Sequence, residues 1–148
     1  MKHVFLGADH AGFKLKNEIK QSLESKGYLV HDLGAHTLDE NDDYPEFAAA
    51  AAHAVSESKQ GTGILFCGSG QGMCIAANKI KGVRAVSALT IRDVKLARQH
   101  VNANVLCLSG WELSKVKASQ LVRVWLETPF SEAARHNRRI KKIARLER

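Results

Sequence analysis

One segment constrains the fold of this chain more than any other. It is a short apolar run at 64–66, followed by glycines at 68, 70 and 72 and then by a helical pattern. A buried strand, a glycine-rich turn and a helix in this order are typical of proteins in which helices connect parallel strands. Because alternate glycines leave backbone N–H groups unobstructed by side chains, the turn also predicts an anion-binding loop.

Strand-length apolar runs alternate with helical patterns along the whole chain, which indicates an α/β fold. We expect strands at 2–6, 28–32, 63–66, 84–88 and 105–108. We expect helices between the loop 7–12 and Gly27, at 45–58, 72–80, 91–100 and 113–127, and from Ser131 onward with Ser131 as the N-cap. The pattern predicts a Rossmann-like three-layer sandwich, with a five-stranded parallel sheet, helices on both faces and a basic C-terminal helix. At 148 residues, the chain fits a single domain spanning 1–148.

In a parallel sheet, ligands gather beyond the carboxyl ends of the strands. The loops there are predicted at 7–12, 33–44, 67–72, 87–90 and 109–112. Asp9, His10 and Cys67 all lie in these loops, so the sequence predicts that they face one crevice.

Cys67 stands where the third strand becomes the glycine turn, which makes it a candidate for chemistry. A free thiol titrates near about 8.5, and a helix terminus shifts a pKa by less than about one unit. The helix dipole alone therefore does not make a thiolate, and loop amides, a nearby cation or an acidic substrate C–H must contribute. An ordinary buried cysteine is the alternative interpretation.

The charge distribution and cysteine count restrict the class of protein. The net charge is +7, and residues 135–148 alone carry +6. Only 6% of residues are aromatic, so the basic tail lacks the stacking platform typical of single-strand RNA binding. The three cysteines are odd in number and have no CxxC spacing, which predicts free thiols rather than a disulfide framework or a zinc site.

The compartment is predicted from what the sequence lacks. No run approaches the roughly 18 apolar residues of a membrane span, and the N-terminus shows no signal-peptide pattern. We therefore expect a cytoplasmic protein that binds neither membrane nor nucleic acid.

Several motifs in order resemble the ribose 5-phosphate isomerase B and galactose 6-phosphate isomerase family. They cover essentially the whole chain, and together they are far more specific than a lone glycine turn. They are GADHAG at 7–12, DYP at 43–45, CGSGQG at 67–72, IAANKIKG at 75–82, VRA at 83–85, RQH at 98–100, NANV at 102–105 and RHNRR at 135–139.

The resemblance implies aldose–ketose isomerisation through an enediolate. Cys67 corresponds to the base that moves a proton between neighbouring carbons, and His100 to the residue that opens the sugar ring. The amides from Gly68 to Gly72, which include Gly70 and Gln71, together with the Ser69 hydroxyl, correspond to the anion hole. Without the resemblance, Ser69 could simply cap the turn, and His100 could be a helix-terminal cation.

The resemblance also implies the substrate contacts. They are Asp9, His10, Tyr44 and Asn102 for the sugar phosphate, with Arg135 and Arg139 for the phosphate. The two arginines stand four apart and so share one helix face. Asp9 could also cap the first helix, and Tyr44 could pack under the long loop.

The resemblance further implies a homodimer or homotetramer with active sites shared between subunits, so a monomer should be inactive. No cofactor is expected. We also expect no metal, because the sequence shows no clustered carboxylate and histidine set.

Three positions depart from the family pattern. Val101 replaces an asparagine, Trp111 replaces an arginine, and Met73 stands where some relatives place a glutamate base. Met73 cannot titrate, which favours the relatives that use the cysteine. The other two changes keep a hexose 6-phosphate isomerase (allose or galactose 6-phosphate) open as an alternative. Two alternatives from other classes are a non-catalytic α/β module that binds a nucleotide at the glycine loop and a protein that binds RNA through its basic tail.

Overall fold

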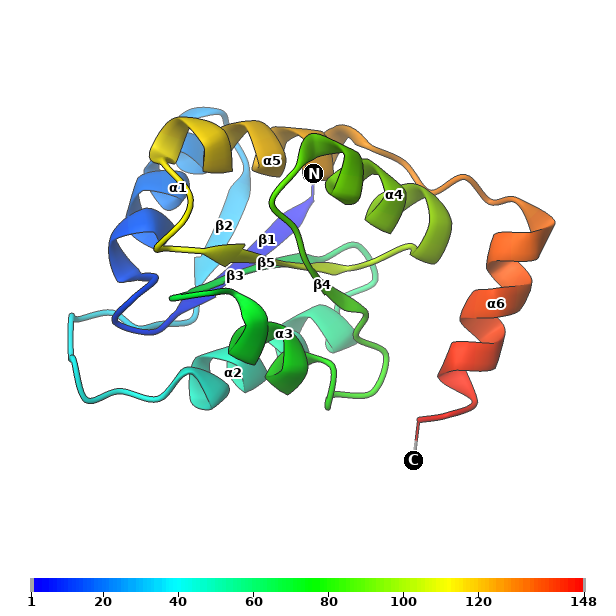
Figure 1. Ribbon diagram of the computed structural model, residues 1–148, viewed down its shortest axis with the longest axis horizontal. Helices are drawn as coiled ribbons and strands as arrows, with labels where there is room; N and C mark the ends of the chain where they lie inside the picture. The colour runs from blue at the N-terminus through cyan, green and yellow to red at the C-terminus, as the bar shows by residue number, and fades with distance from the viewer. Residues whose placement is uncertain (1, 148) are drawn as a thin grey trace.

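The computed structural model describes residues 2–147 and contains one parallel sheet between two layers of helices (Figure 1). Its strands are β1 (His3–Ala8), β2 (Leu29–Asp32), β3 (Thr62–Cys67), β4 (Ala85–Ser87) and β5 (Val105–Ser109). Its helices are α1 (Phe13–Ser25), α2 (Tyr44–Glu57), α3 (Gln71–Ala77), α4 (Ile91–Val101), α5 (Lys115–Glu127) and α6 (Ala134–Ala144). Helices α1, α4 and α5 cover one face and α2 and α3 the other. The predicted α/β architecture is confirmed.

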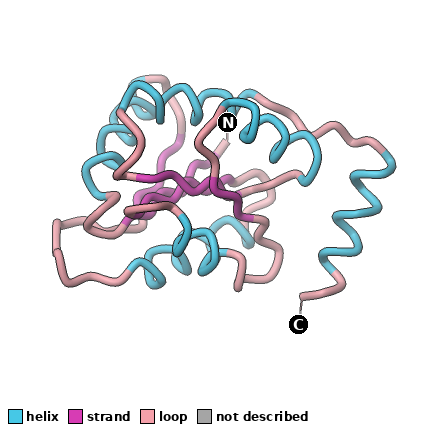
Figure 2. Tube along the Cα trace, viewed as in Figure 1, coloured by secondary structure: helices cyan, strands magenta, loops and turns pink. Residues whose placement is uncertain are grey.

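The strand order is β2-β1-β3-β5-β4. From β1 the chain moves outward to β2, and from β3 it moves to the opposite side of the sheet. The reversal between β1 and β3 is a topological switch point, where loops diverge and leave a crevice at the carboxyl ends. Figure 2 traces the long loop at 33–43, which leaves β2 on this side before α2 begins.

The apolar run of β3 is buried on both faces, which explains why it is continuous rather than alternating. Leu65 packs on the side of α2 and α3, whereas Ile64 and Phe66 pack on the side of α1 and α5. All three side chains are fully buried. The strand that carries Cys67 is therefore held by packing on both of its faces.

The loops at the crevice approach each other more closely than side chains would allow. A Cβ atom on Gly12 would overlap the backbone carbonyl of Phe66, and one on Gly110 would overlap the carbonyl oxygen of Ala11. These contacts join the loop after β1 to the end of β3 and to the loop after β5. Glycine is required at both positions because the neighbouring atoms belong to the backbone and cannot move aside.

Helix ends differ from the sequence prediction by more than one residue at three places. Helix α3 ends at Ala77 instead of residue 80, and α5 begins at Lys115, where the Ser114 hydroxyl accepts a hydrogen bond from the Lys117 amide. The expectation that Ser131 caps the last helix is wrong. Ser131 Oγ lies 2.7 Å from His136 Nδ1, and the chain turns at Glu132 (φ 55°) before α6 begins at Ala134.

No helix within residues 2–147 is both long and apolar enough to cross a membrane.

Lys16 on α1 is a fully buried cation. Its ammonium lies 2.7 Å from Asp32 Oδ1 and also donates to the carbonyl of Ala35, while Lys20 lies 3.1 Å from Asp32 Oδ2. Burial raises the pKa of the Asp32 carboxyl, but hydrogen bonds from Lys16, the Gly34 amide and Lys20 outweigh it and hold that pKa below its usual range. The ion pair between Lys16 and Asp32 therefore connects α1 to the end of β2.

We expect Lys16→Met to lower the free energy of unfolding by about 3 kcal/mol at pH 7, because one buried charge loses its partner. Lys20→Met is the matched control on the same helix, and removing this partly exposed amine should cost at most about 1 kcal/mol.

Because folding lowers the pKa of Asp32, its contribution is complete above the ordinary aspartate value and is lost as the pH falls through the lowered one. Urea unfolding at pH 7 and pH 3 should therefore show a smaller Lys16→Met deficit in acid. Equal losses for both variants at pH 7 would contradict this assignment.

Candidate active site

Asp9 lies directly beyond β1 and is almost fully buried. Its amide donates to Phe66 O (3.3 Å), and its Oδ1 accepts a hydrogen bond from the Gly12 amide (3.0 Å). Burial raises the pKa of Asp9, and the Gly12 hydrogen bond opposes this only in part. The N-cap residue of α1 is Gly12, so Asp9 closes the turn before the helix rather than capping the helix itself. A carboxyl with a raised pKa is suited to exchanging a proton with a sugar oxygen.

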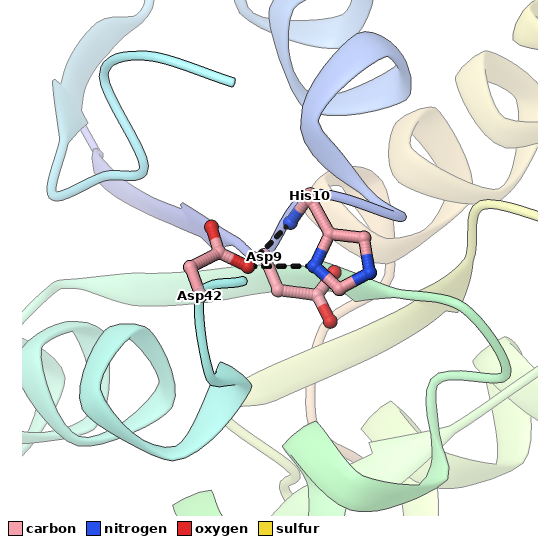
Figure 3. A group of neighbouring side chains, drawn as sticks. All are labelled: Asp9, His10 and Asp42. Carbon is pink, nitrogen blue, oxygen red and sulfur yellow. Dashed lines mark hydrogen bonds and ion pairs between the residues drawn. The ribbon is translucent and has the colours of Figure 1, made fainter. Parts of the chain in front are cut away.

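His10 is held by Asp42, a residue of the long loop (Figure 3). Asp42 Oδ1 lies 2.7 Å from His10 Nδ1 and accepts a hydrogen bond from the His10 amide at 2.9 Å. One carboxylate oxygen each of Asp9 and Asp42 and one ring nitrogen of His10 all lie within 4.8 Å of one another. The expectation that carboxylates and histidines would not cluster is therefore wrong, because the long loop returns to the end of β1.

The glycine loop after β3 is fixed by its carbonyl groups. Cys67 O accepts a hydrogen bond from the Gly110 amide (2.8 Å), and Gly68 O accepts from the Ser109 hydroxyl (2.6 Å) and the Trp111 amide (3.1 Å). The Cys67 side chain is buried, and its sulfur accepts from the Gly70 amide (3.2 Å). With the carbonyls bound to the loop after β5, the loop's amides are left for other partners.

Three of these amides carry no hydrogen bond within residues 2–147: those of Gly68, Ser69 and Gly72. The Ser69 hydroxyl accepts from the Gln71 amide (3.2 Å), so it does stabilise the turn. Gly70 has φ +80°, a conformation that glycine adopts without strain. Free amides beside a thiol can stabilise an anion that forms next to the sulfur.

Two aromatic rings border this loop. A Cβ atom on Gly72 would overlap the Tyr44 ring, and one on Gly68 would overlap the indole of Trp111. Tyr44 is the first residue of α2, and its side chain lies at the start of α3. Trp111 remains 73% exposed. Both rings are therefore placed to contact a ligand bound at the loop.

The other expected site residues form a second group. His100 and Asn102 lie at the end of α4, which returns the chain to the start of β5, so they are at the opposite edge of the sheet from Cys67. The rings of His100 and His136 have centroids 4.4 Å apart. Arg135 and Arg139 are exposed on α6, which lies beside α4 and away from the sheet (Figure 1).

Asn102 is occupied within the chain. Its Oδ1 accepts from Arg98 Nη1 (3.1 Å), and its backbone carbonyl accepts from Arg84 Nη2 (2.8 Å). It adopts a left-handed conformation (φ 46°) that ends α4. The structure thus brings Asp9, His10, Tyr44 and the 67–72 loop together, and it holds His100, Asn102, Arg135 and Arg139 apart from them.

Known proteins are similar to this chain over nearly its whole length. The family described as Ribose/Galactose Isomerase matches residues 4–143. The chain belongs to this family. The probable ribose-5-phosphate isomerase B of Mycoplasma genitalium is 45% identical over 147 residues, covering 99% of this chain and 96% of that protein. The ribose-5-phosphate isomerase B of Escherichia coli is 39% identical, with 99% and 97% covered.

Solved structures of the Ribose/Galactose Isomerase family agree with the fold. The ribose-5-phosphate isomerase B of Mycoplasma genitalium with bound ribulose-5-phosphate has a TM-score of 0.94 and 44% identity, covering 99% of this chain and 96% of that one. The ribose-5-phosphate isomerase B of Clostridium thermocellum has a TM-score of 0.94 and 38% identity, with 99% and 97% covered. The protein is accordingly an isomerase.

All three cysteines are free thiols, and they differ in environment. A hydrogen bond from Cys107 lowers the pKa of the half-buried Cys74 to about 7, although burial acts in the opposite direction. Burial raises the pKa of the Cys107 thiol well above its ordinary value, and its hydrogen bond to Cys74 adds to this.

We expect iodoacetamide to alkylate Cys74 before Cys107, with a rate for Cys74 that rises as the pH increases through about 7. Peptide mapping by mass spectrometry at pH 6, 7 and 8 measures both rates. The Cys74→Ser variant identifies the fast-reacting peptide. Faster labelling of Cys107 at any of these pH values would contradict the assignment.

Proposed function

We propose that this sugar-phosphate isomerase interconverts D-ribose 5-phosphate and D-ribulose 5-phosphate. The observation that supports this most directly is the loop at 67–72, where a buried thiol stands beside amides that have no partner within residues 2–147. The Mycoplasma genitalium relative, whose structure holds ribulose-5-phosphate, shares the fold over 99% of the chain.

In the proposed reaction, the Cys67 thiolate removes the proton from C2 of the open-chain aldose. The electron pair of the C–H bond forms the C1–C2 double bond, and negative charge accumulates on the enediolate oxygens. The amides of Gly68, Ser69 and Gly72 stabilise this charge because they are already oriented and need no rearrangement. The same proton then returns to C1, while the hydroxyl proton of O2 passes to O1 and the C2=O bond forms, which completes the ketose without any cofactor or metal.

Ring opening and phosphate binding require the second group of residues. His100 would exchange protons with the ring oxygen and the anomeric hydroxyl, with Asp9 as a contact. Arg135 and Arg139, four residues apart on the exposed surface of α6, would bind the phosphate. Because these residues lie at the opposite edge of the sheet from Cys67, one chain cannot supply both halves of a site. A second subunit must contribute His100 and the arginines, in a homodimer or a homotetramer.

The three free thiols are compatible with a reducing cytoplasm, which is the location that we propose. A hexose 6-phosphate remains the second candidate substrate because of Trp111. Its indole covers Gly68 and is open to solvent, so it adds a flat apolar surface beside the anion loop. Such a surface suits the face of a longer sugar.

The first test is a substrate assay with purified, chelator-treated protein. Ribose 5-phosphate, allose 6-phosphate and galactose 6-phosphate are compared in one experiment. We expect the pentose to give the highest kcat/KM, and Cys67→Ala to lower kcat by at least about 100-fold, the scale of one general base, without loss of thermal stability. A preference for a hexose would transfer the mechanism to that substrate. Inactivity on all three would favour a binding protein for nucleotides or RNA.

The shared site is tested by mixing two inactive variants. Cys67→Ala and His100→Ala chains, unfolded and refolded together, form mixed dimers in which one of the two sites has both residues intact. Random pairing should restore about a quarter of the wild-type activity. Each variant refolded alone is the control. No recovery from refolded, oligomeric mixtures would show that Cys67 and His100 act in the same chain.

A further inference from the structure

Asp42 has no part in the reaction proposed above, yet it is the residue bound most closely to His10. It comes from the long loop between β2 and α2, 32 residues away in sequence. One oxygen, Oδ1, accepts a hydrogen bond from the His10 amide at 2.9 Å and lies 2.7 Å from Nδ1 of the ring. Backbone and side chain of His10 are thus both held by a single carboxyl oxygen (Figure 3).

The other oxygen of Asp42 has a different environment. Oδ2 is buried and has no hydrogen-bond partner among residues 2–147, and the Asp42 side chain is only 10% exposed. Leaving a buried polar atom unpaired is unfavourable by about 1–3 kcal/mol, so native proteins rarely do so without a functional reason. An asparagine could accept the same two bonds through its oxygen without burying a charge. The carboxylate is therefore poorly explained by folding alone.

The contact determines which nitrogen of His10 is available. Nδ1 is bound to Asp42, and no other hydrogen bond to the ring occurs in the described part of the chain. Figure 3 shows Nε2 on the far side of the ring, pointing away from Asp42. A neutral ring carries one proton, whereas the protonated ring donates from both nitrogens at once. Only the protonated ring can bind Asp42 through Nδ1–H and still offer a positive charge at Nε2.

The surrounding charges favour that protonated ring. The hydrogen bond with Asp42 raises the pKa of His10, while desolvation lowers it. The negative charges of Asp9, Asp42 and Glu40 raise it further. Asp9 belongs to the loop after β1, and Asp42 and Glu40 belong to the loop before α2.

We propose that Asp42 is a positioning residue, which holds the His10 ring in one orientation and keeps it protonated so that Nε2–H donates to a negatively charged oxygen of the substrate. The proposal rests on the proposed function, because it takes His10 to be a substrate contact. Asp42 itself does not touch the substrate.

The first test is the pH dependence of kcat/KM for ribose 5-phosphate in Asp42→Asn. Without the carboxylate, the pKa of His10 falls toward about 6.5, so the ring loses its proton at a lower pH. Between the two midpoints only the wild-type ring is protonated, and there we expect a loss of about 10- to 100-fold, the scale of one charge-assisted hydrogen bond. At pH 6 both rings are largely protonated, so the loss should shrink. A loss independent of pH would overturn the proposal.

Asp43→Asn is the matched control, since Asp43 is the adjacent exposed residue and asparagine suits its helix-capping position. It should leave the pH profile unchanged. Thermal unfolding should show a single cooperative transition for Asp42→Asn, as for the wild type. If that variant fails to fold, Asp42→Ser replaces it in every measurement.

A double-mutant cycle separates action through His10 from an independent effect. In a His10→Gln background, Asp42→Asn should cause no further loss of kcat/KM, because its partner is already absent. Losses that multiply would show that Asp42 acts by another route and would overturn the proposal.

An NMR titration of His10 without substrate keeps the two proposals distinguishable. The midpoint should lie above about 6.5 in the wild type and fall in Asp42→Asn but not in Asp43→Asn. If the wild type is active but the His10 midpoint is the same in Asp42→Asn as in the wild type, the Asp42 proposal alone is overturned. A wild type inactive on every sugar phosphate would overturn the proposed function and with it the role of Asp42 toward substrate.

Discussion

The site depends on the close contact of three loops that have no room for side chains. Gly12 lies against the backbone of Phe66, and Gly110 lies against the carbonyl of Ala11, so the ends of β1, β3 and β5 are in direct backbone contact. Hydrogen bonds to the carbonyls of Cys67 and Gly68 complete this arrangement. A thiol, a buried carboxyl and free amides are consequently fixed before any ligand arrives. Groups oriented in advance stabilise developing charge without the penalty of rearrangement.

Much of this crevice could be predicted because parallel sheets impose a rule on their loops. Once the strands were located from apolar runs, Asp9, His10 and Cys67 had to follow neighbouring carboxyl ends. Asp42 could not be found in this way. It lies in a polar loop without periodicity, and only the path of that loop back to β1 brings it to His10. The start of α6 was misjudged for a similar reason, since the Ser131 hydroxyl binds the side chain of His136 instead of a helix amide.

The chain has the fold of its isomerase relatives, yet its basic helix α6 lies apart from the crevice that carries the thiol. The tail at 135–148 holds seven basic residues against one acidic residue. Under the proposed function, the separation has a simple meaning: each subunit contributes proton transfer to one site and phosphate binding to another. Assembly is then part of catalysis rather than an addition to it.

The two tryptophans of the chain lie in opposite environments. Trp125 is 1% exposed on α5, where its indole nitrogen donates to Thr62 and the Arg98 guanidinium stacks on its ring. Trp111 is 73% exposed and lies on Gly68 of the anion loop. Their fluorescence is therefore divided between two reporters: emission from Trp125 follows the integrity of the core, and emission from Trp111 follows what enters the crevice. The tryptophan fluorescence of the unmodified protein thus reports on both folding and ligand binding in one emission spectrum.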